Sequence, residues 1–256
     1  MVVRHRVTIS VRSYAAVWAA EELGPQHPAL LAPLHTDEVP PPERVLQAGA
    51  ELSRAGLFDE RAGGLHPDLR HTFRLLARPS VEFYGWIVTQ RPAANLSALA
   101  AWDGDGAVLA VLDGDTLTLS PVRPAMLAEA LVDRLPQTPP AHGRSVTAPA
   151  NELETQHEPG AAFAGTTGSK TSSPAARALQ RLAAAPRTAA AQLYVAARDG
   201  ASRRARNPYP LNVLDLPDGR WFMQHANTSG QVWVTAAPAS TQSLVARLGE
   251  MRRALN

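Results

Sequence analysis

Residues 71–135 have the sequence HTFRLLARPSVEFYGWIVTQRPAANLSALAAWDGDGAVLAVLDGDTLTLSPVRPAMLAEALVDRL. Four segments are predicted to be strands, at 81–89, 96–102, 107–112 and 116–120, because alternating apolar residues bounded by Asp-Gly turns are typical of antiparallel hairpins. A short helix that ends before Pro79 precedes them, and a second helix that begins at Pro124 follows them. The stretch therefore predicts an antiparallel meander flanked by helices.

The same order of elements recurs from Ala178 to the end of the chain. A helix stopped by Pro186 is followed by predicted strands at 189–197, 211–216, 220–225 and 231–235, and then by a helix that contains Leu244 and Leu248. We interpret this recurrence as an internal duplication, with halves at about 1–140 and 141–256. Helices grouped against an antiparallel sheet make an α+β architecture. We therefore expect residues 1–256 to form a single α+β domain of two quasi-twofold halves, with a central antiparallel sheet and two groups of helices.

The remaining segments carry weaker signals. Residues 7–11 have the alternation of a strand, and Ser13 is expected to cap the helix that follows. Residues 25–42 are rich in proline and are expected to be an extended connection, whereas 44–57 has helical spacing. Residues 157–173 combine few bulky side chains with many Gly, Ser and Thr, so we expect a flexible loop there.

Composition restricts the class of protein. The 256 residues are 45% hydrophobic and 19% charged, which is ordinary for a globular chain. The chain has no cysteine, its N-terminus lacks the apolar run of a secretory signal, and no segment approaches the roughly 18 apolar residues of a membrane span. We expect a cytoplasmic protein with no membrane partner.

The sequence contains no complete motif for catalysis or cofactor binding. The segment 165–171 resembles a phosphate-binding loop, but Ser169 stands where a glycine should precede Lys170, and no buried strand leads into it. The Asp-Gly turns at 103–106 and 113–115 lack the further oxygen ligands of a calcium loop. No zinc-binding His spacing and no nucleophile elbow occur. We expect no catalytic residues, no cofactor and no metal, and thus a protein that is not an enzyme.

One basic cluster stands out between two predicted strands of the second half. It consists of Arg198, Arg203, Arg204 and Arg206, with Tyr209 close behind. Arginines beside an aromatic residue are a feature of nucleic-acid and anion-binding sites. The opposing interpretation, which we favour, is a solvated hairpin tip whose charges discourage pairing of sheet edges.

Three segments resemble the EspG family, the cytosolic chaperones of actinobacterial type VII (ESX) secretion. They are 57–65, the helix-to-strand junction at 75–79 and 143–146. The resemblance implies the α+β fold of two halves described above and a non-catalytic binding function. It implies that the partner is the helical tip of a PPE-like secretion substrate in a PE–PPE pair, which the chaperone keeps soluble for export.

The resemblance also implies where the partner docks: on the sheet, on the helices of the second half and on the loop between the first half's opening strands. Here that loop is 90–95. On the strand before it, Val81, Phe83 and Ile87 form an apolar face expected to pack on helices, which leaves Tyr84 and Trp86 on the other face. Both could simply cover core instead. The candidate protein-binding residues are Tyr84, Trp86, Gln90, Arg91 and Asn95, with Arg203 and Arg204 as the other candidate region.

Overall fold

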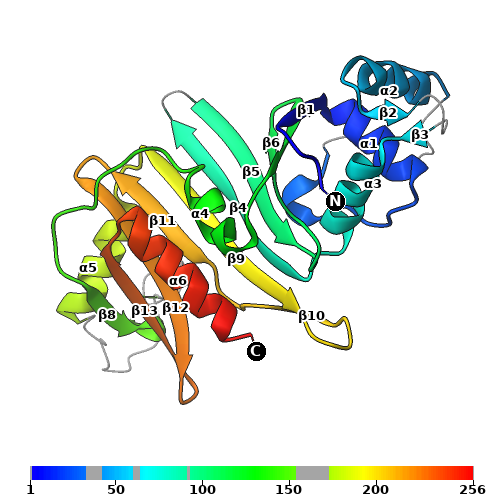
Figure 1. The fold of residues 1–256 in the computed structure, drawn as a ribbon. Coiled ribbons are helices and arrows are strands. Elements are labelled where there is room, and N and C mark those ends of the chain that lie inside the picture. Colours follow the sequence, from blue (N-terminus) through cyan, green and yellow to red (C-terminus); the bar gives the residue numbers. More distant parts are fainter. Residues whose placement is uncertain (1, 33–41, 60–63, 91–92, 154–172, 256) are drawn as a thin grey trace, which may run out of the picture.

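A computed structural model describes residues 2–32, 42–59, 64–90, 93–153 and 173–255 (Figure 1). Eleven of the described strands form one sheet. Ten of them lie in the order β1-β7-β6-β5-β4-β9-β11-β12-β13-β8, and β10 pairs with β9 to the side of this path. All of these strand pairs are antiparallel, as predicted.

The first half contributes five strands to this sheet and a separate two-stranded ribbon. The five are β1 (Val7–Ser10), β4 (Val81–Gln90), β5 (Ala93–Trp102), β6 (Ala107–Asp113) and β7 (Thr116–Pro121). The ribbon pairs β2 (Phe58–Asp59) with β3 (Gly64–Leu65). The second half contributes β8 (Val146–Pro149), β9 (Ala189–Arg198), β10 (Arg204–Arg206), β11 (Leu211–Leu216), β12 (Gly219–Thr228) and β13 (Gln231–Pro238).

The helices begin where local sequence favours them. Pro67 and Pro174 stand in the first turns of their helices, and the side chains of Ser10, Ser173 and Ser240 accept hydrogen bonds from backbone N–H groups as N-caps. The α-helices are α1 (Val11–Ala20), α2 (Pro42–Arg54), α3 (Pro67–Ala77), α4 (Leu127–Val132), α5 (Pro174–Ala184) and α6 (Thr241–Arg253). Within the described ranges three 3₁₀ turns accompany them: η1 (Pro28–Leu30), η2 (Pro124–Met126) and η3 (Ala150–Glu152).

The strand order repeats on the two sides of the central β4–β9 pair. Moving outward, β4, β5, β6, β7 and β1 on one side correspond to β9, β11, β12, β13 and β8 on the other. The predicted repetition of the strand plan in the two halves is therefore confirmed, and the halves meet through an antiparallel pair at the centre of one continuous sheet.

Each face of the sheet has its own covering. We call them the Phe83 face and the Tyr84 face, after neighbouring residues of β4 that point to opposite sides. Helices α4 and α6 lie on the Phe83 face (Figure 1), where Val81, Phe83 and Ile87 join a core with Leu131 and Leu248. The prediction that these three strand residues pack on helices is confirmed.

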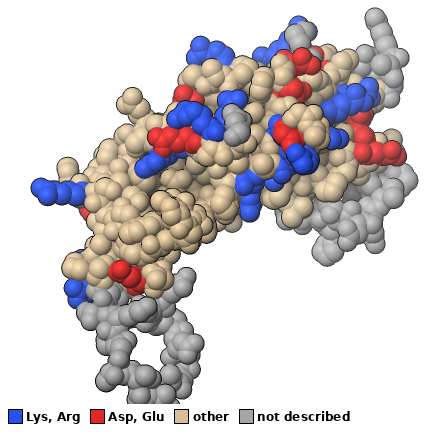
Figure 2. Space-filling model, turned by 90° about the horizontal axis from the view of Figure 1, so that it is seen from below, with Lys and Arg blue, Asp and Glu red and all other residues tan. Residues whose placement is uncertain are grey.

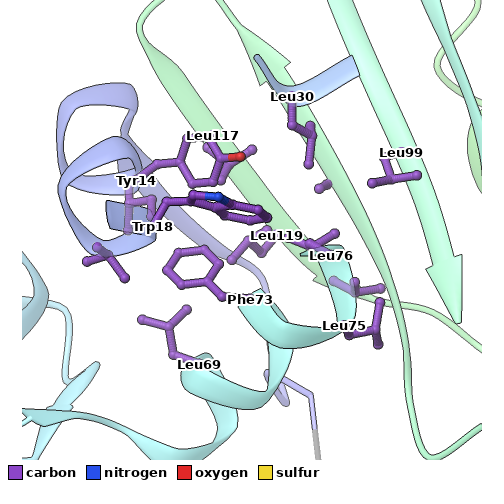
Figure 3. Close-up of a cluster of buried hydrophobic side chains, with 14 of the residues drawn as sticks. Tyr14, Trp18, Leu30, Leu69, Phe73, Leu75, Leu76, Leu99, Leu117 and Leu119 are labelled. Atoms are coloured by element: carbon purple, nitrogen blue, oxygen red, sulfur yellow. The ribbon is translucent and has the colours of Figure 1, made fainter. Parts of the chain in front are cut away.

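The Tyr84 face is covered at both ends. At the first-half end, the N-terminal helices pack their aromatic residues Tyr14, Trp18 and Phe73 against β5, β6 and β7 (Figure 3), with ring centroids 5.5 to 6.3 Å apart. At the other end, Leu179 of α5 packs with residues of β11, β12 and β13. A stretch of sheet between these two clusters is less deeply covered, and it contains the candidate site.

Several local predictions are wrong in detail. Ser10, and not Ser13, caps α1. The helix begins at Val11, the Ser10 hydroxyl accepts a hydrogen bond from the N–H of Ser13, and the Ser13 hydroxyl instead donates to the carboxylate of Glu51 from α2. Segment 25–42 contains η1, whose Leu30 is fully buried, so part of it belongs to the core. Asn95 belongs to β5 and pairs with Val88, which makes the connection after β4 shorter than predicted. The predicted flexible loop at 157–173 lies outside the described residues except for Ser173.

Candidate functional site

The junction of the two halves is built around a close approach of two strands. Tyr84 of β4 lies opposite Tyr194 of β9, and Gly85 lies opposite Leu193. A Cβ atom on Gly85 would lie 2.8 Å from Leu193 Cδ2 and closer still to the carbonyl oxygen of Gln192. Glycine is therefore required here so that the two strands can pair at this distance.

Aromatic rings gather at this junction on the Tyr84 face. The rings of Tyr84 and Tyr194 are stacked, with centroids 5.4 Å apart and planes inclined by 14°. Trp86 stands edge-on to both, at 5.9 Å from Tyr84 and 6.0 Å from Tyr194. Such pairs contribute beyond their buried area, so the three rings form a rigid group contributed by both halves.

Two arginines of β10 extend over these rings. The guanidinium carbon of Arg206 lies 5.0 Å from the Tyr194 ring centroid, and that of Arg204 lies 5.7 Å from the Tyr84 centroid. These are cation–π distances. Arg204 also donates to Glu82 and to the Tyr84 hydroxyl. β10 thus fastens the loop after β9 to the aromatic group.

Beneath Arg204 lies a buried carboxylate. The side chain of Glu82 is completely buried, and its oxygens lie 2.6 Å from Arg204 Nε and 2.7 Å from His27 Nε2. The other ring nitrogen of His27 accepts a hydrogen bond from the N–H of Ala29, so Nε2 carries the proton that is donated to Glu82. Burial alone would raise the pKa of Glu82, but these hydrogen bonds and the neighbouring positive charge outweigh it and lower the pKa.

This network changes the role predicted for Tyr84. Its side chain is 1% exposed, because His27 stands edge-on to it at 4.6 Å and the N-terminal segment covers it. The prediction that Tyr84 lies on an accessible face is wrong, and the alternative that it covers core is right. Trp86 lies two residues further along β4 and is half-buried, at the edge of the area that His27 and the N-terminal segment cover.

Beyond Trp86 the Tyr84 face opens. A row of paired residues crosses the sheet from Trp86 through Gln192 and Asn212 to Met223. Gln192 is exposed, and Trp86, Asn212 and Met223 are half-buried. Val88, next along β4 on this face, is 48% exposed. We call this row, together with Val88 and Tyr194, the open sheet face.

The other predicted contact residues lie around this surface. Gln90 and Asn95 are both exposed, at the end of β4 and near the start of β5. Asn95 pairs with Val88 and thus lies on the same face of the sheet. Arg91 lies outside the described residues. The structure therefore brings Trp86, Gln90 and Asn95 together along one hairpin.

The basic cluster is largely engaged within the protein. Arg198 donates to the carbonyl oxygens of Pro79 and Ser202, and Arg203 forms an ion pair with Asp199 at 2.9 Å. The hydrogen bond to Glu82 raises the pKa of Arg204 above its ordinary value. On the side seen in Figure 2, arginine and acidic side chains are interspersed. Arg198 and Arg204 are thus engaged in contacts within the protein, which disfavours the nucleic-acid alternative.

The sequence prediction missed most of the second half's contribution to the open sheet face. Tyr194, Gln192, Asn212 and Met223 were not singled out. A signal was present, because Gln192-Leu193-Tyr194 repeats the pattern of Glu82-Phe83-Tyr84. Aligning the two proposed halves at this point would have identified Tyr194 as the counterpart of Tyr84 in the second half.

Among the described residues, no group of three or more His, Asp or Glu side chains is placed to hold a metal ion. Likewise, no described helix is long and apolar enough to cross a membrane.

The fold and this surface define a class: an α+β protein of two pseudo-symmetric halves whose central sheet exposes a band of aromatic and polar side chains. The chain belongs to the EspG family, whose sequence pattern it matches over residues 10–250. No curated protein sequence matches the chain.

Among solved structures, the chain is similar to the type VII secretion system chaperone EspG5 of Mycobacterium tuberculosis, solved in complex with the PE25–PPE41 dimer. The TM-score is 0.71 at 15% sequence identity, and the match covers 98% of this chain and 97% of EspG5. At this identity the likeness establishes the fold, which agrees with the α+β architecture predicted from the sequence.

Proposed function

We propose that this chain is a non-catalytic chaperone of type VII secretion that acts in the cytoplasm. It binds the helical tip of a PPE-type protein, keeps that protein soluble and delivers it for export. Membership of the EspG family supports this role, as does the likeness to EspG5, a chaperone solved with a PE–PPE dimer. The observation that carries the proposal is the open sheet face between two helical clusters.

The chemistry of this surface suits a helical protein tip. Trp86 and Tyr194 combine a large apolar area with a polar group, which is typical of residues that dominate binding energy. Gln192, Asn212 and Asn95 supply hydrogen-bonding groups around them. An apolar helix tip would aggregate when exposed alone, and an aromatic centre with a polar border can bury it reversibly.

The proposed contacts run from the hairpin of β4 and β5 to β9. Trp86 and Tyr194 form the centre, Val88 extends it, and Gln90 and Asn95 border it. Arg91 and Arg203 stay in the proposal as outer contacts. Tyr84 and Arg204 act indirectly, because Tyr84 stacks on Tyr194 and Arg204 holds Glu82.

Co-expression tests the proposal directly. The tagged chain would be produced together with each PE–PPE pair encoded in the same genome and analysed by affinity capture and size-exclusion chromatography. At least one PPE-type protein is expected to become soluble and to elute with the chain as a stable complex. If the chain is folded and none of the pairs elutes with it, the proposal is wrong.

A further inference from the structure

Strand β10 is anchored at both ends. Among the described strands it pairs with β9 alone, and all three of its residues are exposed. At one end, Arg204 donates to the buried carboxylate of Glu82 at 2.6 Å. At the other end, the side chain of Asn207, the next residue, donates to a backbone carbonyl oxygen of α6 at 3.0 Å. These two anchors determine where Arg206 lies over the ring of Tyr194.

The anchor at Arg204 depends on a residue of the N-terminal segment. One carboxylate oxygen of Glu82 accepts from His27 Nε2 at 2.7 Å and from Arg204 Nη2 at 3.1 Å, so the two donors share it. The other oxygen accepts from Arg204 Nε. A completely buried carboxylate is strongly disfavoured unless its oxygens are hydrogen-bonded. Both His27 and Arg204 are therefore needed to keep Glu82 charged and in this orientation.

The segment that carries His27 is itself held in place. We call residues 26–32 the η1 segment. The hydroxyl of Ser97 in β5 donates to the carbonyl oxygen of Ala29, which ties this segment to the sheet. Nδ1 of His27 accepts from the N–H of Ala29 at 3.1 Å. This bond fixes the orientation of the imidazole ring, so that Nε2 points at Glu82.

We propose that His27 is a positioning residue: through Glu82 and Arg204 it fixes the position of β10. Arg206 is thereby held over Tyr194, at the centre of the surface proposed for partner binding. His27 is 8% exposed, so a docking partner does not touch it and its effect on binding is indirect. The consequence for affinity rests on the proposed chaperone function, whereas the position of β10 does not.

Hydrogen–deuterium exchange of residues 199–206 in the intact chain tests this link with no partner present. His27→Asn retains an oxygen that can accept from the N–H of Ala29, but its shorter amide does not reach Glu82. Exchange in 199–206 is expected to become about tenfold faster, because a hydrogen bond to a charged group is lost. His27→Gln places its amide nitrogen near the position of Nε2 and should restore slow exchange.

Leu30→Ala is the control for a loss of stability alone. Leu30 is fully buried in the η1 segment, and its apolar side chain takes no part in the hydrogen bonds to Glu82. This variant should lower the melting temperature at least as much as His27→Asn and leave exchange in 199–206 unchanged. Unchanged exchange in His27→Asn, or equal acceleration in His27→Asn, His27→Gln and Leu30→Ala, overturns the proposal.

A double-variant cycle on partner affinity provides the second readout. With a PPE-type partner found by co-expression, His27→Asn and Arg204→Met are each expected to weaken binding about fivefold or more. The double variant should bind no more weakly than Arg204→Met alone, because His27 acts through Arg204. Losses that multiply in the double variant would show that the two residues act independently, and the proposal would then be wrong.

The two proposals can fail separately. If no PPE-type protein binds the folded chain but exchange follows the expected pattern, the chaperone function is wrong and the link from His27 to β10 stands. If a partner binds and exchange in 199–206 is the same in His27→Asn and the wild type, the chaperone function stands and His27 is not a positioning residue.

Discussion

Arg204 donates two hydrogen bonds to the carboxylate of Glu82, a residue 122 positions earlier in the chain and in the other half of the molecule. The distances are 2.6 and 3.1 Å, and His27 binds the same carboxylate from a third segment. One buried charge therefore joins the N-terminal segment, the first half and the second half.

Glu82→Gln is expected to destabilise the protein by about 3 kcal/mol or more at neutral pH, because removing one member of a buried ion pair leaves the other partners uncompensated. The exposed pair of Arg247 and Glu250 provides the control. Glu250→Gln should change the free energy of unfolding by less than about 0.5 kcal/mol. Urea unfolding measures both, and similar losses in the two variants would contradict the role given to Glu82.

The same carboxylate predicts a pH dependence. The pKa of Glu82 is lowered in the folded protein, so its contribution is present above the pKa of the unfolded chain and is lost as pH falls through the folded pKa. The difference in unfolding free energy between wild type and Glu82→Gln should therefore be largest at neutral pH and shrink below about pH 4. A difference that stays constant down to the acid limit of folding would refute this.

Gly85→Ala is expected to destabilise the chain by about 1–3 kcal/mol, because the new Cβ would clash with Gln192 and Leu193 where β4 meets β9. Gly49→Ala is the matched control. Gly49 lies in α2 with nothing within 4 Å of an added Cβ, so alanine should stabilise the helix by about 1 kcal/mol. Thermal melting of the two variants should move in opposite directions.

Trp86→Ala is expected to weaken binding of a PPE-type partner by about 2 kcal/mol, as truncation of a central aromatic residue does. Trp233→Ala serves as the control, since Trp233 neighbours Val234 on β13 and points to the opposite face of the sheet. Calorimetry with the purified complex partner gives the affinities.

Val88→Asp, a change at an exposed position, should weaken binding without altering the melting temperature. Full affinity in both Trp86→Ala and Val88→Asp would place the binding site elsewhere.

The salt dependence of the affinity distinguishes binding of a protein partner from binding of a polyanion. Docking on apolar and aromatic groups is expected to change little with ionic strength, whereas phosphate contacts weaken steeply with salt. The affinity for the partner would be measured between about 50 and 200 mM salt. Over this range, a nucleic-acid complex with several phosphate contacts loses orders of magnitude in affinity. A steep loss of partner binding would favour the arginine cluster over the open sheet face.

The amino-acid sequence by itself determined the four consecutive strands predicted in each half, their order and the repetition of that order, but not the short strands β2, β3 and β10. These features depend on local information: alternation of apolar residues, and Asp-Gly, Asn/Ser-Gly and proline positions that end one element and begin the next. The apolar character of Val81, Phe83 and Ile87 also sufficed to identify a face that packs on helices.

The tertiary structure alone decided what covers the other face. Alternation shows that Tyr84 and Trp86 share a side of the sheet, but it does not show that His27 and the N-terminal segment bury one and leave the other at the border. Likewise, Tyr194 reaches Tyr84, and Arg204 reaches Glu82, only because β4 and β9 pair across the junction of the halves. Such contacts join residues far apart in the chain, and local sequence patterns carry no information about which distant segments will meet.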